Sequence, residues 1–131
     1  APGVNGSGDC RRIVEFVDIY PTLTELIGIG APTHLEGTSL TPQLRDPTAA
    51  RDEPAVVTYL PTNHAVFHDD WNYIRYSDGS EELYHRATDP HEFTNLIEQS
   101  ESRIIADRLA PWIPHTPASD IPANKKLGGT E

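Results

Sequence analysis

The chain has 131 residues, of which 37% are hydrophobic, and it carries a formal net charge of -10. This length suffices for one small domain with a modest core, and the acidic balance argues against nucleic acid as a partner, because phosphate binding needs a concentrated basic patch. The single cysteine, Cys10, excludes an internal disulfide framework and a zinc site built on several cysteines, and no apolar run approaches the ~18 residues of a membrane span.

The first ten residues, APGVNGSGDC, are rich in turn-forming residues and lack the basic and then apolar pattern of a signal peptide. We therefore expect this stretch to come from the interior of a longer protein. Cys10 could be a reactive thiol, but a bystander thiol is the favoured interpretation.

Residues 13–29 show helical periodicity, with Pro21 either kinking the helix or lying in the first turn of a segment capped by Asp18. Gly28 and Gly30 are expected to end it. The stripe consists of six apolar residues at three- and four-residue steps: Phe16, Ile19, Tyr20, Leu23, Leu26 and Ile27. Three more apolar residues lie off that stripe, namely Ile13, Val14 and Val17. This helix therefore needs more cover than a small domain readily offers.

After the helix the sequence predicts a turn at Gly37, a helix cap at Thr38 or Ser39, and a short helix that ends at Leu44. The segment DPTAARDEP, residues 46–54, is a polar connector.

Four segments then have strand character: 55–60, 64–68, 71–76 and 82–86. In the third, Trp71, Tyr73 and Arg75 alternate with Asn72, Ile74 and Tyr76. Asp78-Gly79 is a strong hairpin signal, because the tight turns between antiparallel strands need a positive φ. These segments predict an antiparallel sheet of three or four strands.

The C-terminal part begins with an Asp89-Pro90 turn into HEFTNLI, residues 91–97, which we expect to form a short helix. A final helix opens at Ser100 or Ser102, and four of its residues are expected to point inward: Ile104, Ile105, Leu109 and Trp112. From Pro114 onward there is no periodicity, which is typical of a tail.

The polar residues do not assemble a catalytic centre. The six histidines are scattered along the chain: His34, His64, His68, His85, His91 and His115. His64 and His68 lie on one face of a predicted strand, about 13 Å apart; with Asp69-Asp70 they could be drawn as a metal site, but a solvated strand end is favoured. The pairs Asp69-Asp70 and Glu81-Glu82 are most simply solvated carboxylates. No G-x-S-x-G elbow and no phosphate-binding loop is present.

Three stretches, in this order, resemble the C-terminal end of the sulfatases, in the alkaline-phosphatase-like superfamily. They are VEFVDIYPTLTELIGIGAPTHLEGTSLTPQL, NHAVFHDDWNYIRYSDGSEELYH and TDPHEFTNL, and together they cover roughly residues 13–113. Within the family the likeness is greatest to bacterial enzymes similar to iduronate-2-sulfatase.

The resemblance implies an α+β fold, a small antiparallel sheet with packed helices, preceded by the last helix of an α/β catalytic domain. Residues 1–53 would be trailing helices and connector of that domain, 54–113 the C-terminal subdomain, and 114–131 a disordered tail. The surplus apolar surface of residues 13–29 would then face a sheet of the catalytic domain, and we expect the isolated chain to expose it or to self-associate.

The chemistry that the resemblance implies belongs to the longer parent protein. Sulfatases hydrolyse sulfate esters with a formylglycine, made in a C-x-P-S-R motif, and with a calcium ion. Cys10 is followed by Arg-Arg-Ile-Val instead, and Asp69-Asp70 is not at the position of the calcium ligands. We therefore expect no catalytic residue, metal ligand or cofactor in this chain, and no turnover by the chain alone.

Asn63 and His64, in the N-H-A stretch, are the residues that the resemblance places nearest the substrate. An equally good interpretation is that His64 packs at the subdomain junction. Relatives commonly have Arg where Phe67 stands, which leaves the substrate open. The expected partners are the N-terminal catalytic domain and, for the parent, a sulfated sugar or another sulfate ester, in the periplasm or outside the cell. The alternatives are a free-standing binding module and an inactive truncated gene product.

Overall fold

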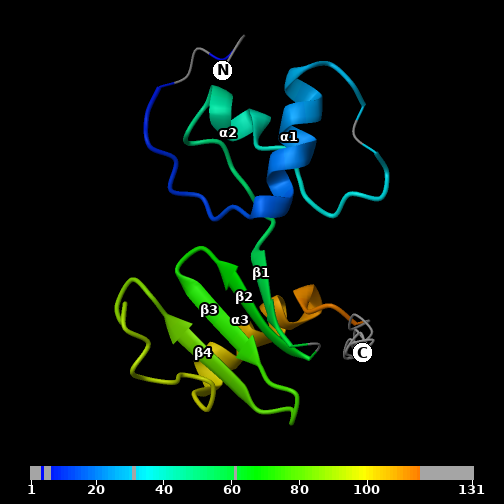
Figure 1. Ribbon diagram of the computed structural model, residues 1–131. Coiled ribbons are helices and arrows are strands. Elements are labelled where there is room, and N and C mark those ends of the chain that lie inside the picture. The colour runs from blue at the N-terminus through cyan, green and yellow to red at the C-terminus, as the bar shows by residue number, and fades with distance from the viewer. Residues whose placement is uncertain (1–3, 5–6, 31, 61, 116–131) are drawn as a thin grey trace, which may run out of the picture.

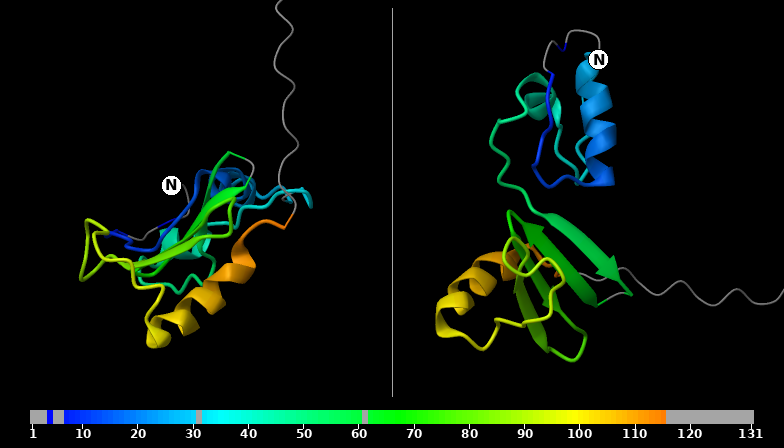
Figure 2. Two further views of the ribbon diagram at one scale, coloured as in Figure 1. Left: turned by 90° about the horizontal axis from the view of Figure 1, so that it is seen from below. Right: turned by 90° about the vertical axis from the view of Figure 1, so that its left-hand side faces the viewer.

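The computed structural model describes residues 4, 7–30, 32–60 and 62–115 (Figure 1). Two helices, α1 and α2, form one group above a four-stranded sheet, and the connector 46–54 leads from this group into the sheet. Figure 2 shows the C-terminal helix α3 lying along one face of the sheet. The elements are, in chain order, η1 Phe16–Asp18, α1 Ile19–Leu26, α2 Thr41–Arg45, β1 Ala55–Tyr59, β2 Asn63–His68, β3 Trp71–Arg75, β4 Glu81–His85, α3 Ser100–Leu109 and η2 Ala110–Trp112.

The sheet is an antiparallel meander in the order β1-β2-β3-β4. Its central row pairs Val66 with Tyr73 and Tyr73 with Leu83, and all three side chains are buried. The neighbouring residues Asn72 and Ile74 belong to the opposite face, as the alternation of the sequence predicted. The predicted fold class, a small antiparallel sheet with packed helices, is confirmed.

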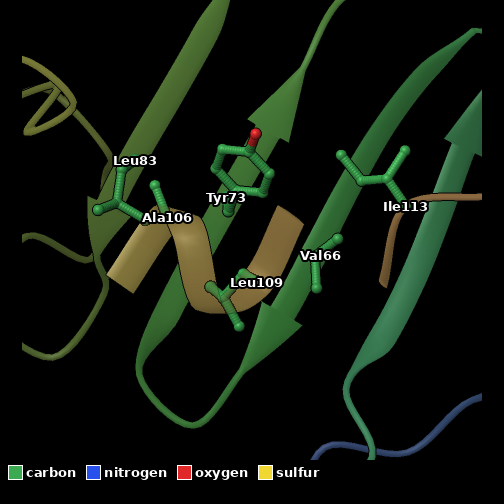
Figure 3. Close-up of a cluster of buried hydrophobic side chains, with 6 residues drawn as sticks. All are labelled: Val66, Tyr73, Leu83, Ala106, Leu109 and Ile113. Atoms are coloured by element: carbon green, nitrogen blue, oxygen red, sulfur yellow. The ribbon is translucent and has the colours of Figure 1, made fainter. Parts of the chain in front are cut away.

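The core lies between the sheet and α3 (Figure 3). It is formed by six buried residues, three from the strands and three from α3 and the segment that follows: Val66, Tyr73, Leu83, Ala106, Leu109 and Ile113. The buried positions of α3 include small residues, Ser102 and Ala106, so the helix backbone can come close to the strands.

The predicted inward face of α3 is wrong in part. Leu109 is buried and Ile105 packs against the core, but Ile104 is 71% exposed and Trp112 is 47% exposed. The helix turns Ser102, Ala106 and Leu109 toward the sheet. Ile104 lies two positions from Ala106, about 200° around the helix. Trp112 belongs to the tighter turn η2.

The segment 91–97, predicted to be helical, contains no helix. Glu92 has a φ of 55°, which a right-handed helix does not allow. The Asp89 carboxylate accepts a hydrogen bond from the Thr94 N–H at 2.8 Å, which holds the segment as a turn.

The first helix is shorter than the predicted range 13–29. One 3-10 turn precedes it, and α1 itself begins at Ile19, so that Pro21 lies in its first turn. Gly28 follows the helix with a φ of 75°, which confirms the predicted glycine stop. Helix α2 begins at Thr41, with Leu40 rather than Thr38 or Ser39 as its N-cap residue. Of the predicted tail, 114–131, the residues from 116 onward lie outside the part of the chain that the structure describes.

Candidate functional site

Asp18 is the centre of a buried hydrogen-bond network that joins three segments of the N-terminal half. Only 1% of its surface is exposed. Its carboxylate accepts hydrogen bonds from the Glu15 N–H at 2.8 Å, from the Thr38 N–H at 2.9 Å and from Arg51 Nη2 at 2.8 Å. Asp18 is the N-cap residue of α1, but its side chain does not cap the helix. Its role is to hold the 36–41 segment and the connector against η1.

Thr22 and Gly37 complete this attachment. The Thr22 hydroxyl donates to the Asp18 carbonyl at 2.6 Å and accepts from the Leu40 N–H at 2.8 Å. A Cβ on Gly37 would lie 2.1 Å from the carbonyl oxygen of Val17, a distance that no side chain tolerates. The first resembling stretch is therefore explained by structure: its Asp, Thr and Gly fasten one segment to another.

The third stretch, TDPHEFTNL, closes the outer edge of β4. The Asn95 side chain accepts from the Leu83 N–H at 3.0 Å, and the Leu96 N–H donates to the Leu83 carbonyl at 2.8 Å. Glu92 accepts from Asn72 of β3 at 3.1 Å. These contacts satisfy backbone groups that an edge strand would otherwise leave open. They are structural contacts that hold the stretch against the sheet.

Helix α1 is packed with its polar side inward. Its buried residues are Pro21, Thr22 and Thr24. The predicted apolar stripe instead faces outward, from Phe16, which is 92% exposed, through Ile19, Tyr20 and Leu23 to Ile27. An amphipathic helix normally buries its apolar stripe, so this surface is the strongest sign of a missing neighbour in the described part of the chain.

A groove of about 340 Å³ lies where the N-terminal half meets β1 and the end of η2; we call it the junction groove. Its volume falls within the usual range for small-ligand pockets, roughly 300–1,000 Å³. The lining residues come from segments far apart in the sequence: Glu15, Val17, Asp18, Glu36, Thr38, Arg51, Glu53, Pro54, Val56, Thr58, Trp112 and Pro114. The Glu15 carboxylate accepts from the Val56 N–H at 2.8 Å and thereby fixes one wall.

The electrostatic character of the junction groove is acidic. Four carboxylates and one guanidinium line it. The guanidinium, Arg51, is buried against Asp18 and also donates to the Ile13 carbonyl at 3.0 Å. Its charge is thus already paired inside the protein, so the groove has no free cation to receive a sulfate group.

The two predicted substrate contacts are the first two residues of β2. Asn63 links the end of β1 to the segment after β3. Its side-chain amide donates to the Tyr59 carbonyl at 3.0 Å, and its side-chain oxygen accepts from the Ser77 N–H at 3.1 Å. His64 is 6% exposed, and its Nδ1 is 3.0 Å from the Thr58 hydroxyl oxygen. Thr58 lines the junction groove, so His64 lies behind the groove wall.

The other predicted polar groups remain separate. His68 Nε2 is 3.2 Å from the Asp52 carbonyl, and Nδ1 is 3.2 Å from an exposed Asp69 carboxylate. Within residues 4, 7–30, 32–60 and 62–115, no three His, Cys, Asp or Glu side chains are grouped so that they could hold a metal ion. Cys10 is exposed.

A second hollow, of about 550 Å³, opens beside the first turn of α3 and includes Glu81 and Arg103. Glu81 accepts hydrogen bonds from Arg103 and from the Tyr73 hydroxyl. The Arg103 hydrogen bond holds the pKa of Glu81 below its usual value, while burial raises the pKa of Tyr73. The Glu81 carboxylate and the Arg103 guanidinium neutralise each other, and their ion pair attaches α3 to the sheet.

Sequence reasoning missed Thr58, Arg51 and Trp112. In the sequence, Thr58 has the pattern of an ordinary strand residue and Arg51 lies in a polar connector. Trp112 was expected in the core. Their common surface arises only when 15–18, 51–58 and 112–114 come together. No local pattern could have signalled it.

Comparison with known proteins gives a consistent result. The family model described as N-sulphoglucosamine sulphohydrolase, C-terminal, matches residues 2–116. A protein named Sulfatase from Formosa agariphila is 38% identical over 106 residues, which are 81% of this chain and 21% of that protein. The Delta 4,5-hexuronate-2-O-sulfatase of Bacteroides thetaiotaomicron is 35% identical over 104 residues, 72% of this chain and 22% of that protein.

The fold is also found in solved structures. A putative sulfatase from Bacteroides thetaiotaomicron superposes with a TM-score of 0.56 at 29% identity, over 72% of this chain and 23% of that one. The chain thus spans about a fifth of the length of the curated relatives that it matches. Among the described residues, no helix is long and apolar enough to cross a membrane.

Proposed function

The chain belongs to the sulfatases, in the region described as N-sulphoglucosamine sulphohydrolase, C-terminal, and from this we propose that it completes an enzyme that hydrolyses sulfate esters. The reaction itself would take place in a part of the protein outside these 131 residues. This chain would supply the C-terminal subdomain, residues 54–113, together with the helices and connector of 1–53 that join it to the catalytic domain.

The outward apolar stripe of α1 carries this proposal. A stripe from Phe16 to Ile27 needs an apolar surface opposite it, and most of each relative's length lies outside the matched region. We infer that an N-terminal α/β domain of the same protein covers the stripe. The network around Asp18 would then hold the sheet in a fixed position relative to that domain.

The formylglycine and the calcium ion that sulfatases use would be held by the N-terminal part. The described residues do not fit either group: no three potential ligands are grouped, and Cys10 is followed by Arg11-Arg12 rather than by the formylglycine motif. We propose that this chain's own residues attach the subdomain and border the substrate, and none of them is assigned to the chemical step.

For the substrate we propose a sulfated sugar, because the relative from Bacteroides thetaiotaomicron is named for a hexuronate 2-O-sulfate. Asn63 and His64 would border the site from behind its wall: Asn63 by fixing two loops, His64 by contacting Thr58. A periplasmic or extracellular location is part of the same proposal.

Because the apolar stripe of α1 is uncovered, the proposal can be tested on the isolated chain. We expect the pure chain to bind a hydrophobic dye and to self-associate in light scattering, and we expect the double substitution Phe16→Ser and Leu23→Ser to reduce both. Ile104→Ser is the matched control, because Ile104 is an exposed apolar residue on a different helix. A monomeric chain that binds no dye would contradict the proposal and favour a free-standing binding module.

A further inference from the structure

The junction groove offers a surface of a particular chemical kind. Trp112, which is about half-exposed, contributes an aromatic ring to the lining, and the exposed Thr58 contributes a hydroxyl. An aromatic ring can pack against the apolar C–H surface of a sugar ring. A hydroxyl can donate to or accept from a ligand's hydroxyl groups, and a carboxylate can accept hydrogen bonds from them. Both kinds of group line one groove.

Thr58 has hydrogen-bonding capacity to spare. His64 Nδ1 lies 3.0 Å from its hydroxyl oxygen. If Nδ1 carries the proton, the histidine donates and the Thr58 O–H stays free to donate into the groove. If Nδ1 is unprotonated, Thr58 donates to it and keeps both of its lone pairs for a ligand. In either tautomer His64 fixes the hydroxyl, so we class His64 as a positioning residue and Thr58 as the contact.

The charges of the groove select against an anion. Glu36 and Glu53 contribute carboxylates that are not paired with Arg51, whose guanidinium is bound to Asp18. A sulfate group placed here would meet like charge in a partly desolvated site, which disfavours binding. Hydroxyl groups, in contrast, can donate to these carboxylates.

We propose that the junction groove binds an unsulfated sugar ring of the substrate, stacked on Trp112 and hydrogen-bonded to Thr58. This inference rests on the proposed function, since it assigns to this chain the part of a sulfated saccharide that does not react. The sulfate-bearing ring lies outside the groove, toward the catalytic domain.

The test measures binding to the chain itself. Ligand-observed saturation-transfer NMR would compare N-acetylglucosamine with its 6-O-sulfated form as probes. We expect saturable binding of the uncharged sugar and weaker binding of the sulfated one. Thr58→Val, which keeps the shape and removes the hydroxyl, is expected to weaken binding roughly five-fold, the effect of losing one neutral hydrogen bond. Trp112→Ala is expected to abolish the signal.

Controls separate this result from misfolding and from failure of the proposed function. Thr58→Ser should restore binding, Thr33→Val outside the groove should leave it unchanged, and circular dichroism should show the same fold for all variants. No binding of the uncharged sugar, tighter binding of the sulfated one, or unchanged binding by Thr58→Val would each overturn the inference. None of these results bears on whether the parent hydrolyses sulfate esters, which is decided by sulfate release.

Discussion

Replacing Asp18 by Asn is expected to destabilise the chain by about 3–5 kcal/mol, the cost of breaking a buried ion pair from one side. The substitution leaves the Arg51 guanidinium buried without its counter-charge. It also replaces one of the two acceptor oxygens that hold the Glu15 and Thr38 backbone N–H groups by an amide nitrogen. The measurement is the free energy of unfolding by urea, combined with hydrogen exchange of the amides in residues 15–40.

Glu25→Gln serves as the control, because it removes a carboxylate from an exposed position of the same helix. A double variant with Arg51→Gln should cost less than the sum of the two single changes, since the two side chains share one interaction. A loss of less than about 0.5 kcal/mol for Asp18→Asn, the usual range of surface substitutions, would show that this network does not hold the segments together.

Replacing Leu109 by Ala is expected to cost about 2–5 kcal/mol, the usual range for a large-to-small change in a core. Leu109 is 1% exposed and fills the space between α3 and the sheet. The same change at Ile104 removes a similar apolar side chain from the outer side of the helix and should cost less than about 0.5 kcal/mol.

The two α3 variants are compared by thermal or urea unfolding under identical conditions. Equal costs, or a larger cost for Ile104→Ala, would mean that α3 presents its Ile104 side to the sheet. That result would support the orientation predicted from the sequence over the one in the structure.

The sheet was predictable because period-two alternation in 71–76 and the Asp78-Gly79 turn are local signals, and each one restricts the strand register. The buried face of α3 could not be predicted, because Ile104 and Leu109 are both apolar and only contact with the strands decides which of them is buried. The same holds for Asp18. Its position suggested a helix cap, whereas its partners Thr38 and Arg51 lie 20 and 33 residues away.

The candidate site was predictable only in outline. The resemblance pointed to Asn63 and His64 as substrate contacts, and that role stays a prediction; of the two, His64 contacts a residue that lines the junction groove, Thr58. The groove itself combines residues 15–18, 36–38, the connector, β1 and the end of η2, so its acidic character follows from tertiary structure alone. Several residues of the stretches that resemble the sulfatases, among them Asp18, Gly37 and Asn95, attach one segment to another.

We propose that this chain is the C-terminal region of a sulfatase and completes its fold. The most direct test replaces the matching region of the Formosa agariphila relative by residues 13–113 of this chain. Sulfate release is then measured from a substrate that the intact relative hydrolyses. We expect release by the chimera, and none by the relative lacking this region or by the isolated chain. A soluble chimera as inactive as the truncated relative, or turnover by the isolated chain, would contradict it.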